Sequence, residues 1–111
     1  MADRRSSATR VIAGDLKGRT LVYPRGGAAR PTMQRTRASV FDSLGDRLRG
    51  AVFVDLYAAA GGMGIEALSR GASRAHFVER DAEAARCLAE NLERCRVGPE
   101  RAVIHRCGVA E

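Results

Sequence analysis

Two acidic side chains stand at sequence positions where a parallel β-sheet could present them to one ligand. Asp55 lies near the end of the apolar, β-branched segment Val52–Tyr57, and Glu79 ends the segment Arg74–Glu79. The carboxyl ends of neighbouring parallel strands meet at one edge of a sheet, where an acid after the second strand accepts hydrogen bonds from ribose hydroxyls. We therefore predict that both acids bind a nucleoside cofactor. The competing interpretation is that Asp55 caps local backbone amides and that Glu79 is only a solvated strand end.

The segment between the two acids begins with a run of small residues, Ala58 to Gly64. A tight turn there brings backbone N–H groups close to a ligand, and the helix predicted over Met63–Ser69 follows directly. In the dinucleotide fingerprint Gly-x-Gly-x-x-Gly, the three glycine positions hold Ala59, Gly61 and Gly64. The alanine costs roughly 1 kcal/mol or more if its backbone needs a positive φ. A nicotinamide-dependent Rossmann domain is therefore the less favoured alternative.

The elements that would position this turn alternate regularly along the second half of the chain. We predict three strands separated by two helices: strand Val52–Tyr57, helix Met63–Ser69, strand Arg74–Glu79, helix Ala82–Arg94 and strand Arg101–Arg106. This alternation favours an α/β fold with a parallel sheet and right-handed crossovers. Residues 51–111 are therefore predicted to form a partial Rossmann-like cofactor-binding domain.

The first half of the chain has a different pattern. Residues 1–9 are polar and are predicted to form a disordered basic tail. Two short β-like runs, Arg10–Gly14 and Arg19–Tyr23, with glycines between them, predict a β-hairpin. Thr32 is the expected N-cap of a helix that ends at Gly50. Residues 10–50 are therefore predicted to form a hairpin-and-helix unit in front of the cofactor domain.

The net charge of +6 is distributed unevenly along the chain. Residues 1–50 carry eleven Lys and Arg against four Asp and Glu, whereas residues 51–111 carry eight against nine. A basic segment beside a near-neutral domain favours a polyanionic partner, most simply nucleic acid. The alternative is an arginine-rich composition with no such partner.

Several classes of protein are disfavoured by composition. No apolar run approaches the length of a membrane span, and no apolar segment follows the charged N-terminus as in a signal peptide. The three cysteines, Cys87, Cys95 and Cys107, form no Cys-x-x-Cys pair and have no metal-like histidine spacing. We expect free thiols in a cytoplasmic protein that binds no metal.

Three sequence blocks occur in a fixed order: RVIAG…KGRTL…P…RPTMQRTRASVFDSL within residues 10–44, DLYAAAGGMGIEALSRGA at 55–72 and FVERD at 77–81. Together they resemble the RsmD-type bacterial methyltransferases, and the resemblance covers nearly the whole chain. That family transfers a methyl group from S-adenosylmethionine to the exocyclic N2 amine of a guanine in small-subunit (16S) ribosomal RNA. The resemblance therefore implies a Rossmann-like S-adenosylmethionine-dependent methyltransferase fold, this cofactor, and ribosomal RNA of the small ribosomal subunit as partner.

The resemblance also implies a role for particular residues. The positions that match the cofactor-binding motifs are Asp55, Ala58, Ala59, Gly61, Gly64 and Glu79. The positions that match the RNA and active-site face are Arg10, Arg19, Arg30, Thr32, Arg35 and Arg37. For any one of these arginines, the alternative to RNA contact is that it holds the hairpin against the sheet.

The chain departs from the family pattern at several positions. Ala59 replaces the usual glycine of the turn, Ala38 stands where a glutamate is usual, and Gly108 stands where an aspartate usually meets the adenine. The Asn/Asp-Pro-Pro-aromatic motif that holds the target amine is absent, so the catalytic residues are unknown. We therefore expect an incomplete chain, truncated after the third core strand. The alternative is a non-catalytic RNA- or cofactor-binding remnant.

The expected truncation also predicts an interaction. The apolar strand Val52–Tyr57 would lack a neighbour on one side, and an open apolar strand edge is a site of association. Self-association through this edge is therefore predicted.

Overall fold

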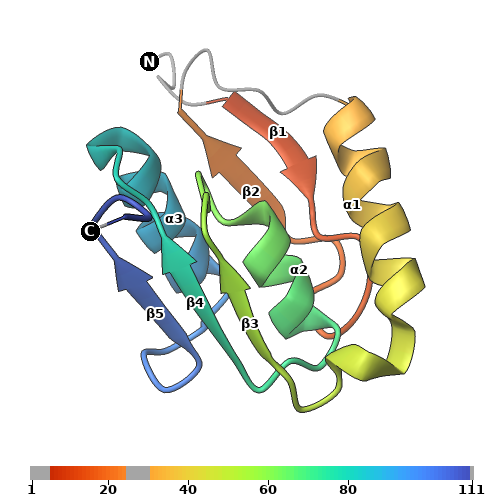
Figure 1. Ribbon diagram of the computed structural model, residues 1–111. Coiled ribbons are helices and arrows are strands. Elements are labelled where there is room, and N and C mark those ends of the chain that lie inside the picture. The colour runs from red at the N-terminus through yellow and green to blue at the C-terminus, as the bar shows by residue number, and fades with distance from the viewer. Residues whose placement is uncertain (1–5, 25–30, 111) are drawn as a thin grey trace.

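The centre of the fold is a three-stranded parallel sheet, seen in a computed structural model that describes residues 6–24 and 31–110 (Figure 1). The strands are β3 (Val52–Asp55), β4 (Arg74–Val78) and β5 (Ala102–His105), paired in that order. The crossovers contain α2 (Gly62–Ser69) and α3 (Ala82–Arg94). The predicted β-α-β-α-β alternation and the parallel sheet are confirmed.

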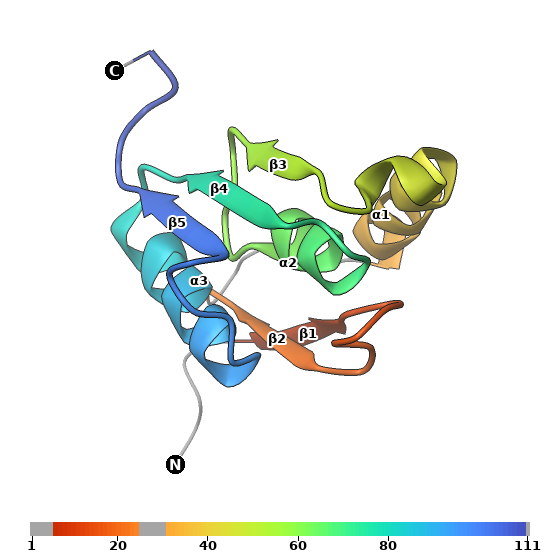
Figure 2. The same ribbon diagram turned by 90° about the horizontal axis from the view of Figure 1, so that it is seen from below.

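In the part of the chain that the structure describes, helices cover one face of this sheet and leave the other without a helix (Figure 2). On the covered face Ala75 and Phe77 of β4 are fully buried against the helices. On the other face Val52 and Val54 of β3 are more than half exposed, at 59% and 53%. Parallel strands are normally covered by other segments on both faces. This face of the sheet carries apolar side chains as a buried surface does, but no described segment packs against them.

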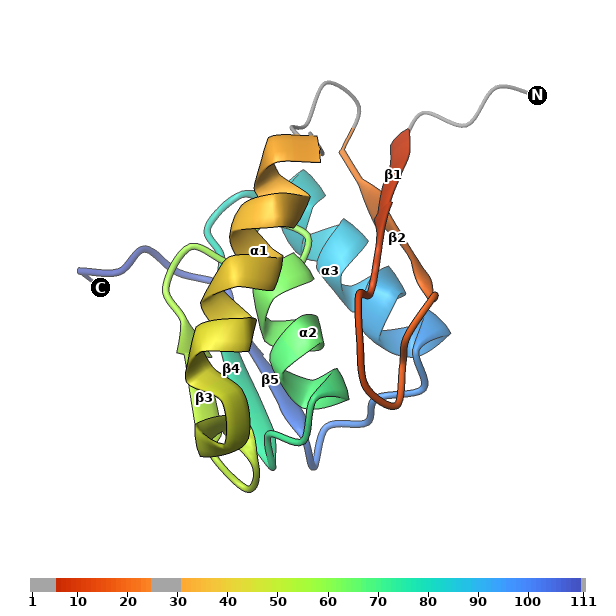
Figure 3. The same ribbon diagram turned by 90° about the vertical axis from the view of Figure 1, so that its right-hand side faces the viewer.

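The N-terminal segment forms a further layer on the helices. Strands β1 (Ser6–Arg10) and β2 (Thr20–Tyr23) pair as an antiparallel hairpin that lies beyond α2 and α3 from the sheet (Figure 2). Helix α1 (Pro31–Leu44), continued by the 3₁₀ turn η1 (Gly45–Leu48), runs alongside α2 (Figure 3).

The hairpin and α1 share one hydrophobic core with the sheet. Leu21 of β2 and Phe41 of α1 belong to the same buried cluster as Ile65, Phe77 and Leu88. Residues 10–50 therefore do not pack as a separate unit in front of residues 51–111.

The predicted N-terminal boundaries are wrong in two places. The first strand spans Ser6–Arg10 rather than Arg10–Gly14, so residues 6–9 of the predicted disordered tail lie in a strand that pairs with β2, with a register shift between Ser7 and Thr9. Residues 1–5 of that predicted tail lie outside the described residues. The reason is the turn: Gly14 and Gly18 adopt positive φ, and residues 11–19 form the connection. Thr32 lies inside α1, because the helix begins at Pro31, a residue favoured at the first helical position.

Three further observations on the described residues concern membrane spans, metal sites and cysteines. No helix among the described residues is long and apolar enough to span a membrane. Within residues 6–24 and 31–110, no group of three or more His, Cys, Asp or Glu side chains could hold a metal ion. Cys87, Cys95 and Cys107 form no disulfide within the described residues, Cys87 and Cys95 are buried, and burial raises the pKa of the Cys95 thiol.

Candidate cofactor-binding site

The turn between β3 and α2 is held closely against β4. The Ala58 N–H donates to the Val78 carbonyl at 3.0 Å, and the Gly61 N–H donates back to the Ala58 carbonyl at 2.8 Å. Ala59 between them has φ 49°, in the left-handed region. The first fingerprint position therefore does need a positive φ, and Ala59 occupies it with a side chain that disfavours this conformation.

The two glycines of the fingerprint allow close packing around the turn because they have no side chain. Gly61 has φ 95°, and a Cβ there would lie 2.4 Å from the Leu88 side chain. A Cβ on Gly64 would lie 2.3 Å from the Phe77 ring. Both glycines are buried, so they let α2 approach α3 and β4 closely and thereby set where the first turn of α2 lies.

The Glu79 carboxylate lies directly beneath the turn. Its Oε1 accepts a hydrogen bond from the Ala59 N–H at 2.6 Å, and its Oε2 accepts one from the Asp81 N–H at 2.9 Å. The acid after the second strand and the small-residue turn are therefore adjacent. Each carboxylate oxygen has a second lone pair, so Glu79 retains acceptor capacity for a hydroxyl while it holds the turn.

A cavity of about 380 Å³ opens at the carboxyl ends of the three strands beside Glu79. It is lined by Leu56, Tyr57, Val78, Glu79, Arg80, Cys107, Gly108, Val109 and Ala110. Its volume is within the range of small-molecule sites. Gly108 lines this cavity, so the position where the family usually has an aspartate faces it without a carboxylate.

A second, smaller cavity of about 110 Å³ lies on the other side of the turn, and Tyr57 lines both. Asp55, Ala58 and Ala59 line it from the sheet side. Burial raises the pKa of the Asp55 carboxyl, and the nearby charge of Glu79 raises it further. The hydrogen bond that Asp55 Oδ1 accepts from the Tyr57 N–H at 3.2 Å lowers the same pKa, but by less than burial raises it. Of the predicted cofactor residues, Asp55, Ala58, Ala59 and Glu79 line one of these two cavities, whereas Gly61 and Gly64 line neither of the two.

The predicted RNA-facing residues do not share one environment. Arg10, Arg19 and Arg35 are exposed, and Arg19 also donates to the Arg94 carbonyl at 3.1 Å. Arg30 lies outside the described residues. Thr32 is described only as part of the α1 backbone.

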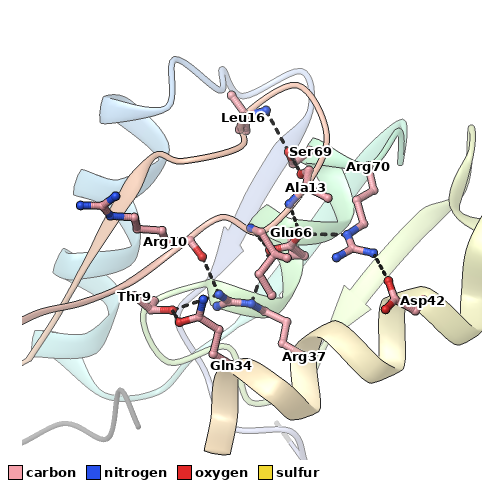
Figure 4. Close-up of polar contacts among 11 residues, drawn as sticks. Thr9, Arg10, Ala13, Leu16, Gln34, Arg37, Asp42, Glu66, Ser69 and Arg70 are labelled. Atoms are coloured by element: carbon pink, nitrogen blue, oxygen red, sulfur yellow. Dashed lines mark hydrogen bonds and ion pairs between the residues drawn. The ribbon is translucent and has the colours of Figure 1, made fainter. Parts of the chain in front are cut away.

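Arg37 is buried, at 4% exposure, and its guanidinium is engaged inside the fold (Figure 4). Its Nη2 donates to the Arg10 carbonyl at 2.7 Å and to Thr9 Oγ1 at 3.0 Å. Its Nε lies 3.4 Å from Glu66 Oε1. This placement argues against a direct RNA contact by Arg37 and favours the alternative, in which an arginine holds the hairpin in place.

Glu66 is a central residue for which the sequence predicted no role, although it lies within the block at residues 55–72. It is fully buried in α2, and its carboxylate accepts hydrogen bonds from the Ile12 and Ala13 N–H groups at 2.9 and 3.1 Å. Arg70 Nε donates to the same carboxylate at 2.8 Å (Figure 4). Two sequence signals were available: an acid inside the otherwise apolar run of α2, and the place of that acid in the block at residues 55–72.

Asn91 is a second buried polar residue that no sequence motif marked. Its side-chain amide exchanges two hydrogen bonds with the Val22 backbone, both 2.9 Å, and donates to the Ala60 carbonyl at 2.8 Å. A single side chain from α3 therefore joins the hairpin to the turn. Nothing in the amphipathic pattern of α3 distinguishes Asn91 before the fold is known.

The parallel sheet, the turn and the acid after β4 define the class as a Rossmann-like nucleotide-binding fold. Residues 9–108 match the family described as Conserved hypothetical protein 95. The chain belongs to this family, and its resemblance to the RsmD-type methyltransferases is confirmed.

Particular relatives agree with this membership. The chain is 43% identical over 84 residues to the Bacillus subtilis (strain 168) protein YlbH, whose name assigns it provisionally to the rRNA methyltransferases, covering 76% of this chain and 46% of that protein. It is 36% identical over 98 residues to ribosomal RNA small subunit methyltransferase D of Escherichia coli (strain K12), covering 88% and 50%. The solved structure of Escherichia coli yhhF, described provisionally as a methyltransferase, superimposes with a TM-score of 0.80 at 30% identity, covering 91% and 53%. The chain thus spans about half the length of these relatives.

Proposed function

We propose that this chain is the cofactor-binding half of an S-adenosylmethionine-dependent RNA methyltransferase. The observation that carries the proposal is the Glu79 carboxylate, held 2.6 Å from the Ala59 N–H at the mouth of a cavity of about 380 Å³. This is the edge of a parallel sheet at which nucleosides bind, and the acid has spare acceptor sites for ribose hydroxyls.

The residues present fit the cofactor in size and chemistry. Glu79 would hold the ribose, while Leu56, Val78 and Val109 would provide apolar contacts for the base. Asp55, Ala58 and Ala59 would surround the methionine end. When bound, S-adenosylmethionine supplies a methyl group already activated by its sulfonium, so the remaining task of the protein is to position an amine in line with it.

The proposed substrate is the N2 amine of a guanine in small-subunit ribosomal RNA. Relatives at 36–43% identity carry rRNA methyltransferase names, and the exposed Arg10, Arg19 and Arg35 of the hairpin and α1 offer cations to RNA phosphates. The absence of a disulfide among the described cysteines is what a reducing cytoplasm favours, and we propose that location.

The uncovered face and free edge of β3 fit the second half of an RsmD-type protein. Among the described residues β3 pairs only with β4, and Val52 and Val54 of β3 are exposed, as are Leu56 and Tyr57 directly after it. The relatives are about twice as long as this chain, so they contain the additional polypeptide that this surface needs. Pairing of two copies through the same edge is the competing occupant, and sedimentation of the chain alone and with a separately supplied second half distinguishes the two.

Titration calorimetry with S-adenosylhomocysteine and, separately, with NAD tests the proposed cofactor. We expect a binding isotherm only with S-adenosylhomocysteine, and an isotherm only with NAD would overturn the assignment. Radiolabelled methyl transfer to small-subunit ribosomal RNA then tests activity. A folded, cofactor-binding chain that transfers no methyl group would support the non-catalytic alternative for this chain by itself.

A further inference from the structure

Asn91 is the point at which the N-terminal hairpin and the cofactor turn meet. Its side chain is fully buried on α3. One N–H of its amide donates to the Ala60 carbonyl at 2.8 Å, the other donates to the Val22 carbonyl at 2.9 Å, and its Oδ1 accepts from the Val22 N–H at 2.9 Å. Both donors of the amide are therefore used, one on each of two segments that lie 31 and 69 residues away along the chain.

These bonds help to fix the conformation of the turn itself. The peptide unit that follows Ala60 is held at both ends, because its carbonyl accepts from Asn91 and its N–H donates to the Ala58 carbonyl at 2.8 Å. The residue before it, Ala59, has φ 49°, and a residue other than glycine stays in this region only where the surrounding contacts hold it there. Asn91 therefore supports the strained turn from the side of α3.

The same helix holds the hairpin along β2. Val22 lies near the end of β2, and the Arg19 guanidinium, directly before this strand, donates at 3.1 Å to a backbone carbonyl at the C-terminal end of α3. Arg10 and Arg19 of the hairpin and Arg35 of α1 are exposed. An RNA strand that contacts all three arginines needs the hairpin in its docked position. RNA bound in this way restrains β2, and with it the backbone that Asn91 holds.

We propose that Asn91 is a positioning residue that couples RNA binding at the hairpin to cofactor binding at the turn, so that each ligand increases the affinity for the other. This inference rests on the proposed function, which supplies both ligands. A fully buried amide loses stability when either partner moves away, because the groups left behind cannot reach water. The positions of Val22 and Ala60 therefore support each other. A ligand that orders one segment reduces what the other ligand must order, and linkage makes the effect equal in both directions.

Titration calorimetry measures this coupling directly. The dissociation constant of S-adenosylhomocysteine is determined for the unchanged 111-residue chain, alone and with a saturating fragment of small-subunit ribosomal RNA. We expect the RNA to tighten S-adenosylhomocysteine binding about five-fold or more. Asn91→Ser, whose hydroxyl is too short to reach both segments, should abolish this effect. Glu90→Gln, at the neighbouring surface position of α3, should leave it intact.

Hydrogen exchange at the Ile12 and Ala13 amides adds a readout that a purely structural role would not move. Both amides donate to Glu66, so they report hairpin docking at a contact that Asn91 does not make. In the unchanged chain, S-adenosylhomocysteine should slow their exchange, because the ordered turn holds the hairpin more firmly. In folded Asn91→Ser protein the basal exchange is faster, but the response to S-adenosylhomocysteine should be lost. The response, rather than the basal rate, distinguishes coupling from lost stability.

The outcomes separate the coupling from the proposed function. If S-adenosylhomocysteine binds but RNA leaves its affinity unchanged or lowers it, the coupling is wrong while cofactor binding stands. An equal RNA effect in Asn91→Ser and in the unchanged chain would remove Asn91 from this role. If neither S-adenosylhomocysteine nor RNA binds the unchanged chain, the proposed function and the coupling both fail. Where Asn91→Ser does not fold, the unchanged chain still decides, since exchange at Ile12 and Ala13 that ignores S-adenosylhomocysteine overturns the coupling.

Discussion

Replacing Glu66 by glutamine tests whether one buried carboxylate holds the N-terminal hairpin against the cofactor domain. Within residues 6–24 and 31–110, the groups that contact this carboxylate are all donors: the Ile12 and Ala13 N–H groups, Arg70 Nε at 2.8 Å and Arg37 Nε at 3.4 Å. A glutamine amide would direct its own N–H₂ group at one of these donors. It would also remove the negative charge between the two arginines.

The expected loss of stability follows from the burial of this group. Removing one partner of a buried ion pair costs about 3–5 kcal/mol. Arg70 keeps Asp42, whose carboxylate lies 3.1 Å from its Nη1, so part of its charge remains compensated. We therefore expect the lower end, about 3 kcal/mol. In a domain of this size, such a loss lowers the melting midpoint by roughly 10–20 °C.

Urea denaturation measures the free energy of unfolding, and hydrogen exchange at the Ile12 and Ala13 amides reports whether the hairpin opens first. Glu90→Gln is the matched control, because Glu90 and Arg94 form the same i,i+4 pair on the surface of α3 at 3.4 Å. A surface pair of this kind contributes about 0.5 kcal/mol or less. Equal losses in the two variants, or unchanged exchange at both amides, would refute this role for Glu66.

Four further predictions concern the turn, the acids and the basic surface. Ala59→Gly should stabilise the chain by up to about 1 kcal/mol, because the backbone has φ 49°, and a lower melting temperature would contradict this. Glu79→Ala should reduce the binding free energy of S-adenosylhomocysteine by about 1–3 kcal/mol, because the hydrogen bond to the ribose is lost. An unchanged dissociation constant in a folded variant would count against that role. Burial raises the pKa of the Asp55 carboxyl. The ammonium group at the methionine end of a bound cofactor would favour the ionised form of this carboxyl. Cofactor affinity should therefore fall as the pH drops through this raised pKa, and calorimetry on Asp55→Asn should show a flatter profile. Arg35→Ala should weaken RNA binding and reduce its salt dependence by about one phosphate contact, whereas an unchanged slope of affinity against salt would remove Arg35 from the interface.

The N-terminal half shows where a local sequence pattern misleads. The β-like run Arg10–Gly14 was expected to be a strand, but the strand ends at Arg10 and the following residues turn toward α2. Ile12 and Ala13 donate their N–H groups to Glu66, 53 or more residues later in the chain, instead of to a neighbouring strand. An apolar stretch predicts burial, but it does not say which partner satisfies the backbone.

Arg35 and Arg37 show that a local pattern also misleads about which residues could contact RNA. Both arginines lie in one basic run of α1, yet one is exposed and the other is 4% exposed beside Glu66. A helix rotates by about 100° per residue, so side chains two residues apart, such as Arg35 and Arg37, point in directions about 200° apart around the helix axis. Which side faces the hairpin depends on how α1 docks, and no property of the run itself specifies that.

The sequence by itself determined the alternation of strands and helices, the small-residue turn at Ala58–Gly64 and the acid after β4, whereas the positive φ at Ala59 was only a condition that the structure then met. These features are local: side-chain periodicity and the steric limits of each residue act over a few neighbouring positions. Only the tertiary structure decided that Glu66 and Asn91 join the hairpin to the cofactor site, and that α1 forms a wall of the smaller cavity. A polar residue on a helix becomes a structural contact only when a distant segment buries it and brings donors or acceptors to it, and that event depends on packing rather than on spacing along the chain.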